Sequence, residues 1–179
     1  MVRAFIAINC PESVRENILR IQKRLENIGN IKPVEPKNLH ITLRFLGNVS
    51  NEELREISKK LDSISSFEKF QISLKGIGAF PNQNYIRVLW IGLDNDSRIK
   101  EIHDKIEDEL GLKKDNSFSS HLTIARIKSI RDKEKIQRIL HENSKTEFGD
   151  FQVEKIELMK SELTKKGPIY TSLKEINLR

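Results

Sequence analysis

The sequence lacks the residues on which several classes of site depend. Cysteine occurs once, as Cys10, so no intrachain disulfide can form and a reducing compartment, the cytoplasm, is expected. The chain contains no glycine-rich phosphate loop, no CxxC pair and no HExxH motif, which argues against an ATPase, a zinc module and a metalloprotease. It also contains no run near the roughly 20 apolar residues that a membrane-spanning helix needs. We therefore expect no metal, no cofactor and no membrane association.

The composition is that of a folded globular protein with an excess of basic residues. Of 179 residues, 37% are hydrophobic and 32% are charged, which suits one compact domain or two small lobes that share a core. The net charge of +6 favours a polyanionic partner such as RNA. The basic residues are scattered through amphipathic segments, so charge alone does not decide whether the protein binds nucleic acid. For the oligomeric state we expect a monomer.

Two matching tetrapeptides stand out, HITL at residues 40–43 and HLTI at residues 121–124. Each alternates polar and apolar residues, and a β-strand sends alternate side chains to opposite faces. We therefore expect His40 and Thr42 to share one face of a strand, and His121 and Thr123 to share one face of another. The chain has only four histidines, and two of them lie in this repeated setting.

Two imidazoles that face one cleft can supply the acid and the base for phosphate ester chemistry. The unperturbed histidine pKa of about 6.5 allows one ring to be neutral and the other protonated near neutral pH. A threonine one strand period from each histidine can donate to the phosphoryl oxygens, where negative charge builds up in the transition state. For an isolated threonine, simple β-propensity would be the alternative. We predict catalytic roles for His40, Thr42, His121 and Thr123.

The elements around the motifs repeat along the chain. Each half reads as strand, helix, motif strand, helix and strand, and the first strand precedes its motif histidine by roughly 30 residues in both halves. This predicts an α+β fold, one domain over 1–179 with two pseudo-symmetric lobes at about 1–80 and 85–179. Each lobe would be an antiparallel sheet with helices on its outer face, and a groove between the lobes would hold both histidines.

Individual elements follow from hydrophobic periodicity and from helix end signals. The expected strands span residues 2–9, 39–46, 70–74, 85–93, 121–127, 151–159 and 169–178, and the expected helices begin after Pro11 and Ser50 and cover 99–110 and 132–142. Residues 31–38 are interrupted by proline and are expected to form a loop. His103 and His141 lie in charged helical segments without a partner at metal-ligand spacing, so we expect both to be solvated.

The two motif strands resemble those of a known family. HITLRFLG (40–47) and SSHLTIARIK (119–128) look like the paired HxTx motifs of the two-histidine (2H) phosphoesterases. With RAFIAI near the start, FPNQNYIRVLWIGL (80–93) and the stretch from Leu163 to Tyr170, the chain resembles more narrowly the RNA 2′,3′-cyclic phosphodiesterases, also called 2′-5′ RNA ligases. A single HxT tripeptide is a weak signal because chance supplies many, but two in this context are specific.

The resemblance implies a bilobal α+β fold, no metal, and opening of an RNA 2′,3′-cyclic phosphate end to a 2′-phosphate. It also implies weak, reversible 2′-5′ joining of RNA, with tRNA halves as the joined ends. Within the family pattern His40 is the proton donor and His121 is the acceptor, a distinction that nothing else in the sequence makes. No nucleotide cofactor is required, because the strained ring carries the activation.

Four further residues are candidates for substrate binding, and the arguments about three of them conflict. Arg44 shares the strand parity of the first motif histidine and should face the groove, although charged residues at strand ends are usually just solvated. Arg126 has the opposite parity to its histidine and would point away unless the strand bulges, yet the resemblance associates it with ligand binding. Phe45 is a core residue by parity and a base-stacking residue by family position. Tyr170 either lines the groove mouth or is a structural aromatic residue.

Two other functions remain open at this point. The same fold could act on a small substrate, such as ADP-ribose cyclic phosphate or a cyclic nucleotide. Alternatively, the chain could be a noncatalytic RNA-binding module that uses both motifs to hold a phosphate, although intact histidines in both halves count against it. The leading hypothesis is a metal-independent cyclic phosphodiesterase that acts on RNA ends.

Overall fold

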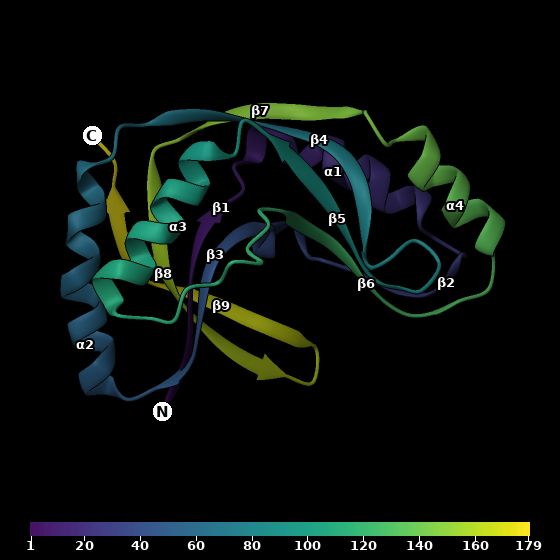
Figure 1. The fold of residues 1–179 in the computed structure, drawn as a ribbon. Helices are drawn as coiled ribbons and strands as arrows, with labels where there is room; N and C mark the ends of the chain where they lie inside the picture. The colour runs from purple at the N-terminus through teal and green to yellow at the C-terminus, as the bar shows by residue number, and fades with distance from the viewer.

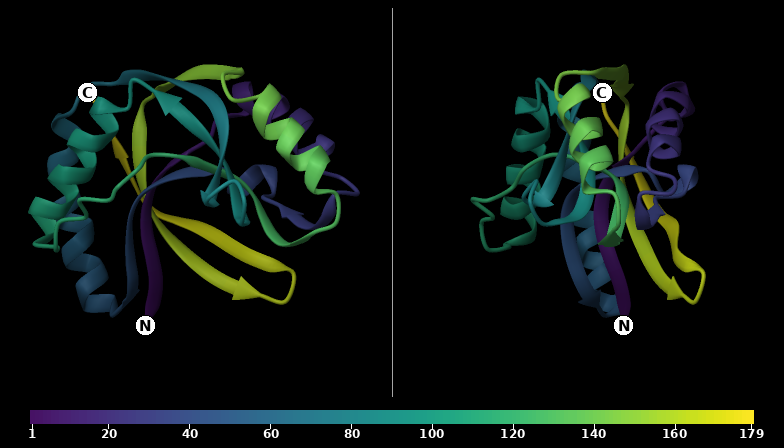
Figure 2. Two further views of the ribbon diagram at one scale, coloured as in Figure 1. Left: turned by 45° about the vertical axis from the view of Figure 1, so that its right-hand side comes forward. Right: turned by 90° about the vertical axis from the view of Figure 1, so that its right-hand side faces the viewer.

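The computed structural model describes all 179 residues, and its elements form a curled antiparallel sheet flanked by helices (Figure 1). The helices α2 and α3 lie at one end of the sheet, and α1 and α4 lie at the other (Figure 1, Figure 2). The predicted α+β class is confirmed. The strands are β1 (Val2–Asn9), β2 (Gly29–Pro33), β3 (His40–Val49), β4 (Phe70–Pro81), β5 (Ile86–Asp94), β6 (Leu122–Ile130), β7 (Glu147–Val153), β8 (Lys155–Thr164) and β9 (Gly167–Asn177). The helices are α1 (Glu12–Arg24), α2 (Asn51–Lys60), α3 (Ser97–Leu110) and α4 (Lys133–Glu142), with short 3₁₀ helices η1 (Pro36–Asn38) and η2 (Leu61–Ser66).

Local sequence signals set the helices much as expected. Pro11 precedes α1, whose apolar stripe, including Ile18 and Ile21, is buried against the sheet. The N-terminus of α2 has a capping box, in which the Ser50 side chain accepts from the Glu53 N–H and the Glu53 carboxylate accepts from the Ser50 N–H. The amphipathic helices therefore present one apolar face each to a common core.

The structure differs from the sequence expectation in three segments. The strand expected over 70–74 continues as β4 to Pro81, because its ladder with β5 extends past the glycines. A loop is expected over 31–38, but residues 31–33 belong to β2, which pairs with β6 as an edge strand. Because β2 has little hydrophobic alternation of its own, its strand conformation depends on that ladder. The single strand expected over 151–159 is two strands, β7 and β8, with a break at Glu154. At the break the chain leaves its ladder with β4 and enters a ladder with β1.

The sheet has two parts, which we call the first lobe (β3, β1, β8 and β9) and the second lobe (β7, β4, β5, β6 and β2). The lobes are joined through β3 and β6, which share a single residue pair, Ile41 with Leu122. The expectation that one lobe is built from 1–80 and the other from 85–179 is wrong, because each half of the sequence contributes strands to both lobes. The strand β4 comes from the first half and lies in the second lobe, whereas β8 and β9 come from the second half and complete the first lobe.

The helices pack on one face of the curled sheet. The helix α1 packs against β6 and β7, and α3 packs against β3 and α2. A core of 39 buried hydrophobic residues lies between helices and sheet and runs through both lobes. On the opposite face, which we call the open face, a small cluster of Phe5, Ala7 and Met159 packs against Tyr170. None of the four α-helices combines the length and the apolarity that a bilayer crossing requires.

Candidate active site

The two motif histidines come together where the lobes join. His40 begins β3 and His121 directly precedes β6, and the residues that follow them, Ile41 and Leu122, form the one pair between these strands. Both paired residues are fully buried, whereas both histidines are partly exposed. His40 also lies close enough to His121 for their charges to interact. The structure therefore brings the two predicted imidazoles into one site.

Both imidazole rings are held in the same way. His40 Nδ1 lies 2.7 Å from the carbonyl oxygen of Asn38, and His121 Nδ1 lies 2.8 Å from the carbonyl oxygen of Ser119. A carbonyl oxygen can only accept, so Nδ1 carries a hydrogen in both rings. The Nε2 atom of each ring is then available to accept a proton as neutral imidazole or to donate one as imidazolium. This arrangement can perform paired acid–base chemistry.

A β-bulge in each motif strand determines which side chains follow the histidine on the open face. The register of β3 with β1 shifts between Thr42 and Arg44, and the register of β6 with β5 shifts between Thr123 and Ala125. Each bulge adds one residue and so reverses the alternation of the strand beyond it. The open face consequently carries two triplets with the same spacing. His40, Thr42 and Phe45 belong to β3, and His121, Thr123 and Arg126 belong to β6 and the residue just before it.

The positions of Phe45 and Arg44 are the reverse of those expected from strand parity. Phe45 pairs with Phe5, its ring centroid lies 6.2 Å from that of Phe5, and the side chain is 69% exposed. Arg44 pairs with the fully buried Ile6 and points to the helix face, where its side chain is 20% exposed. The parity argument is wrong for both residues, because it counts one residue per step and the bulge inserts an extra one.

Arg126 reaches the open face through the second bulge. In an unbroken strand the alternation of side chains would point Arg126 away from the open face. The bulge reverses that alternation, so the side chain lies where the family resemblance places a ligand-binding arginine. Its side chain is exposed and makes no ion pair or hydrogen bond within the chain. Tyr170 lies on the same face, and its ring stands edge-on to His40 with the centroids 5.2 Å apart.

Buried side chains on two helices satisfy carbonyl groups at the bulges. The Leu43 carbonyl accepts from Nδ1 of His103 on α3, and the Ile124 carbonyl accepts from Nε2 of Gln22 on α1, both at 2.8 Å. His103 is 2% exposed and Gln22 is 5% exposed, so the expectation that His103 is solvated is wrong, while His141 is exposed as expected. Each buried polar residue follows an isoleucine of its apolar helical stripe by four residues, a signal that the sequence reasoning missed.

Arg44 belongs to a polar network behind the sheet. Its Nη1 lies 3.0 Å from Glu107 Oε1, and its Nη2 donates to the carbonyl oxygen of Lys113 at 3.0 Å. The same carboxylate oxygen of Glu107 accepts from the backbone N–H of Asp115 at 3.0 Å. This network ties β3 to α3 and to the loop, residues 111–121, that leads into the second motif.

One cluster of potential metal ligands departs from the sequence expectation. Ligand atoms of His103, Asp104 and Glu107 lie within 4.8 Å of one another, although no such partners were expected for His103. The three residues come from one stretch of α3, and the Arg44 guanidinium already pairs with Glu107. The Nδ1 atom of His103 is committed to the Leu43 carbonyl. We therefore interpret the cluster as part of the structural network behind β3.

Aromatic side chains border each motif histidine. The ring of His40 lies 5.0 Å from Phe5, and the ring of His121 lies 5.0 Å from Phe80 and 6.3 Å from Trp90, measured between centroids. The Trp90 ring lies directly over Gly78 on the paired strand, where an added Cβ would overlap the indole. Only glycine fits at that position, so it permits the indole to lie beside the second histidine.

The surroundings of His40 favour its neutral form. Burial is the main cause that lowers the pKa of His40 below its ordinary value of 6.5, and the hydrogen bond to the Asn38 carbonyl opposes this effect. The positive charges of Arg126 and His121 lower the pKa of His40 further. In the free protein the neutral form of His40 is therefore favoured.

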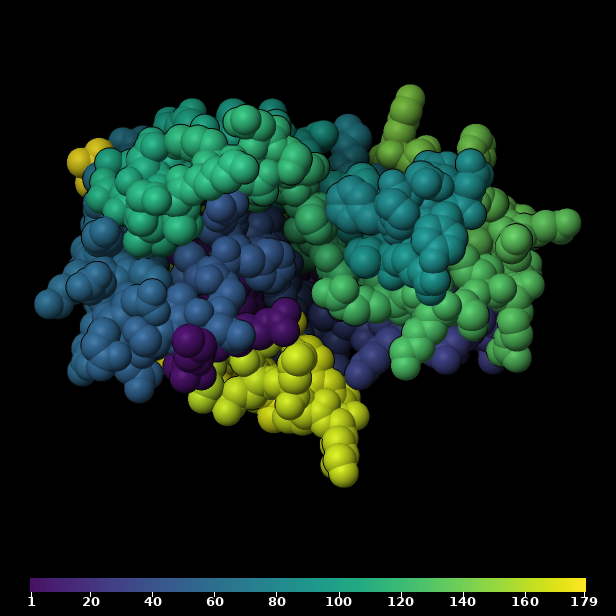
Figure 3. Space-filling model, turned by 60° about the horizontal axis from the view of Figure 1, so that its bottom comes forward, coloured from purple at the N-terminus to yellow at the C-terminus, as the bar shows by residue number.

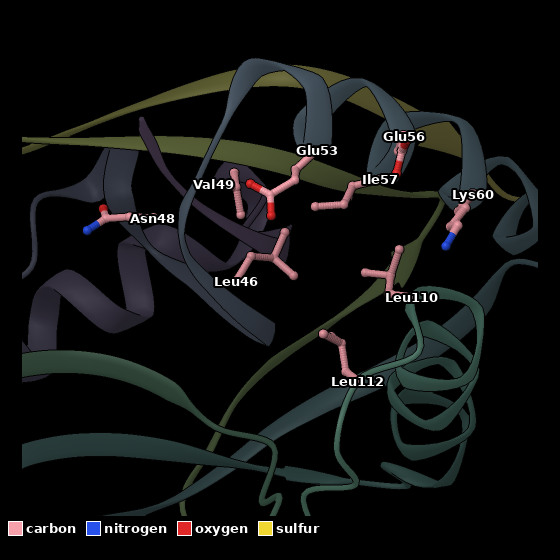
Figure 4. A pocket seen from close by; sticks show the side chains of 9 residues that line it. All are labelled: Leu46, Asn48, Val49, Glu53, Glu56, Ile57, Lys60, Leu110 and Leu112. Atoms are coloured by element: carbon pink, nitrogen blue, oxygen red, sulfur yellow. The ribbon is translucent and has the colours of Figure 1, made fainter.

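Two hollows differ in position and lining. Figure 3 views the molecule from the side of the β8–β9 hairpin, and this face is hollowed between the yellow hairpin, the blue segment that includes β3 and the green segment that includes β6. A separate cavity of about 320 Å³ lies between α2, the end of β3 and the end of α3 (Figure 4). Its lining includes Leu46, Ile57 and Leu110 but none of the motif residues. The second cavity is therefore not part of the candidate active site.

Comparisons of the sequence point to one family. The LigT-like phosphoesterase family model matches residues 8–90 and again residues 91–170. Among the relatives named RNA 2′,3′-cyclic phosphodiesterase, that of Methanocaldococcus jannaschii is 44% identical over 97% of this chain and 99% of its own. The relative of that name from Archaeoglobus fulgidus is 38% identical over 97% of this chain and 98% of its own.

Solved structures with the same fold lead to the same family. A Thermus thermophilus protein superposes with a TM-score of 0.82 and 30% identity over 99% of this chain and 98% of its own. Escherichia coli LigT in complex with 3′-AMP superposes with a TM-score of 0.77 and 26% identity over 99% of this chain and 97% of its own. Because the family model covers both halves and these relatives span nearly the whole chain, this protein belongs to the LigT-like phosphoesterase family.

Proposed function

We propose that the protein hydrolyses the 2′,3′-cyclic phosphate at the 3′ end of RNA to a 2′-phosphate by paired histidine catalysis. The observation that carries this proposal is the matched pair of imidazoles at the junction of the lobes, each fixed through Nδ1 by a backbone carbonyl. The relatives named RNA 2′,3′-cyclic phosphodiesterase support the substrate class. Because water is the nucleophile and the two imidazoles act as base and acid, the reaction requires no nucleophilic side chain.

In the proposed reaction one ring accepts a proton from the attacking water, and the other ring donates a proton to the leaving oxygen on the opposite side of the phosphorus. His121 Nε2 takes a proton from water as the water oxygen attacks the phosphorus. The bond from phosphorus to the 3′-oxygen breaks, and His40 Nε2 gives a proton to that oxygen. The neutral form of His40 is favoured in the free protein, but an anionic phosphate beside the ring favours the imidazolium. Substrate binding thus prepares the donor state of His40.

Side chains that follow the histidines on the open face would hold the phosphate and the terminal nucleoside. The hydroxyls of Thr42 and Thr123 lie one strand period from each imidazole and can donate to the non-bridging oxygens. Arg126 supplies a fixed positive charge without a carboxylate partner, which suits a phosphate ligand. Phe45 and Tyr170 offer exposed and partly exposed aromatic surface for a base. The 3′-AMP bound in the E. coli LigT structure supports a nucleotide ligand for this fold.

Several finer points of the proposal rest on the resemblance and on the residue types. Run in reverse, the same proton transfers would join a 2′-hydroxyl to a cyclic phosphate end, which supports a 2′-5′ ligation side activity, with tRNA halves as candidate substrates. Metal and cofactor are not required by this chemistry, because the ring strain of the cyclic phosphate supplies the activation. We also propose a monomer. A reducing, cytoplasmic setting is consistent with the single cysteine, Cys10, whose thiol is buried and has its pKa raised to about 12.

The test is hydrolysis of an oligoribonucleotide that ends in a 2′,3′-cyclic phosphate, in excess EDTA. We expect turnover to a 2′-phosphate end, identified by its resistance to a 3′-specific phosphatase. RNA binding without turnover would replace the proposal with a noncatalytic module, and turnover of small cyclic phosphates alone would replace the RNA substrate. A 3′-phosphate product would contradict the assignment of the leaving oxygen, and loss of turnover with EDTA would contradict metal independence.

A further inference from the structure

Residues 166–170, at the turn into β9, run along the edge of the open face from Lys32 to His40. At one end the ring of Tyr170 stands against His40. Two residues earlier, the Pro168 carbonyl accepts from the Asn38 side chain at 3.2 Å. Two residues earlier again, the Lys166 carbonyl accepts from Lys32 Nζ at 3.1 Å. The β8–β9 hairpin of the first lobe is thus bound to β2 of the second lobe at a point removed from the histidines.

Lys32 stands beside the phosphate-facing side of β6. It pairs directly with Arg126 across the β2–β6 ladder, and paired residues in an antiparallel ladder share a face. Both side chains are exposed, and neither lies within ion-pair distance of a carboxylate. The positive charge that begins at Arg126 therefore continues outward onto β2.

The hairpin tip adds further positive charge at the same place. Lys165 and Lys166 are exposed and have no carboxylate partner within 4.0 Å. The ammonium of Lys32 has three hydrogens and uses one of them on a neutral carbonyl, so its charge is not compensated and its other donors are free. The Gly167 backbone lies against this ammonium, where an added Cβ would lie 3.1 Å from Nζ. Cations from both lobes thus converge without an internal anion.

The distance from the histidines decides what this cluster can bind. Lys166 directly precedes β9 and lies four residues before Tyr170, and a strand rises about 3.3 Å per residue, so the Lys166 backbone lies on the order of 13 Å from the backbone of Tyr170, whose ring stands against His40. One phosphate group cannot contact both places. Although Lys32 pairs with Arg126, its ammonium is held at the Lys166 end of this segment, so an anion bound there is a different phosphate from the one beside His40.

We infer that Lys32, with Lys165 and Lys166 at the hairpin tip, binds the phosphodiester backbone of the RNA on the 5′ side of the terminal nucleotide. This inference rests on the proposed function, because it places the cyclic phosphate between the histidines and leads the remaining chain across β2 under the hairpin tip. The ligand class is single-stranded RNA of more than one nucleotide. A mononucleoside 2′,3′-cyclic phosphate does not reach the cluster.

The test compares substrates of increasing length with the variant Lys32→Ala. The substrates are a mononucleoside 2′,3′-cyclic phosphate and oligoribonucleotides of two, three and six nucleotides with the same end. Each contact to a single-strand phosphate contributes a slope of about −0.7 in a plot of log affinity against log salt concentration. Relative to 1 M salt, one such contact therefore raises the affinity roughly fivefold at 0.1 M salt. We expect Lys32→Ala to raise KM about fivefold for the longer substrates only, with unchanged kcat, and to reduce the magnitude of the salt slope by about 0.7.

Matched controls separate this inference from a general effect of charge. Lys23→Ala removes an exposed lysine of α1 on the outer side of the molecule and should leave KM unchanged at every length. Lys32→Arg keeps the charge and should retain most of the length dependence. An equal effect of Lys32→Ala on all lengths, or no effect at any length, would overturn the inference.

The proposed function and this inference fail in different ways. If the unaltered protein turned over none of these substrates, the proposed function would be wrong. Binding of an RNA hexamer with a 2′-phosphate end, followed by fluorescence anisotropy, would then still test Lys32. Equal affinity of the unaltered protein and Lys32→Ala for that hexamer would refute the backbone contact on its own.

Discussion

Ile41 and Leu122 form the only residue pair between β3 and β6, and each directly follows a motif histidine. Both are completely buried, so the side chains next to the two histidines are fixed by the core. A displacement of one motif strand must therefore disturb the other at the point where the imidazoles lie. The mutual position of His40 and His121 follows from this one shared pair together with the two carbonyl contacts to Nδ1.

The first prediction concerns the two histidines as a unit. His40→Ala and His121→Ala should each remove most of the cyclic phosphodiesterase activity, because one ring cannot be both acid and base in the same step. The double variant should be little worse than either single variant, since groups that act in one proton-transfer sequence are strongly non-additive. Single-turnover kinetics on an RNA with a 2′,3′-cyclic phosphate end would measure this. Near-native turnover in either single variant would refute the two-histidine mechanism.

The second prediction concerns the hydroxyl groups of the motifs. Thr42→Val and Thr123→Val keep the side-chain shape and the preference for a strand but remove a donor to the phosphate. In other enzymes the loss of one such donor costs on the order of 10²–10³ in rate. We expect kcat to fall toward that range while the melting temperature stays near that of the unaltered protein. Full activity in a valine variant would assign that threonine a structural role only.

The third prediction concerns the pKa of His40. Arg126 is among the charges that lower it, so Arg126→Ala should raise the pKa of His40 toward 6.5 without reaching it, because burial remains. The ring resonances of His40, followed by NMR between pH 4 and 8, would show the shift. Lys128→Ala, at another exposed position of β6, is the control and should produce a smaller shift. An unchanged His40 titration in Arg126→Ala would show that the guanidinium does not act on this ring.

The fourth prediction concerns the buried amide behind the second bulge. Gln22 Nε2 donates to the carbonyls of Val34 and Ile124 at 2.9 and 2.8 Å. Gln22→Leu removes this donor from both carbonyls, but the Ile124 carbonyl still accepts from the Val34 N–H at 2.9 Å. The part-buried Val34 carbonyl is therefore the group that is left unpaired, and one such group costs roughly 1–3 kcal/mol. Chemical denaturation should show a loss in this range for Gln22→Leu and little change for Gln152→Leu, at an exposed position of β7. Equal stabilities of the two variants would contradict a role for the amide in holding the bulge.

Strand alternation predicted the first part of each motif correctly. His40 and Thr42 lie on the open face, and Ile41 and Leu43 are buried, as period-two alternation requires. The placement of Phe45 could not follow from the same rule, because a bulge depends on the neighbouring ladder and on a buried donor that is remote in sequence. Such a donor is visible only after the helix has been packed against the strand.

The ion-pair network of Arg44 illustrates a second limit of sequence reasoning. A charged residue near the end of a strand is usually solvated, and nothing nearby in the sequence identifies Glu107 as its partner. The two residues are brought together by packing of α3 on the back of β3. The edge strand β2 is similar, because its strand conformation is supplied by β6 rather than by its own residues. In both cases contacts between residues remote in sequence determine the structure, and local sequence patterns do not show them.

The exchange of strands between the lobes constrains how the chain can acquire its structure. Neither lobe can complete its sheet until most of the second half has been synthesised. The strand β4 pairs with β5 and β7, and β1 pairs with β8, and all three partners lie in the second half. A chain cut between β4 and β5 would give two pieces with unpaired strand edges, each unable to complete a sheet alone. The short turn between those strands therefore acts as a tether that keeps two mutually dependent pieces at high effective concentration.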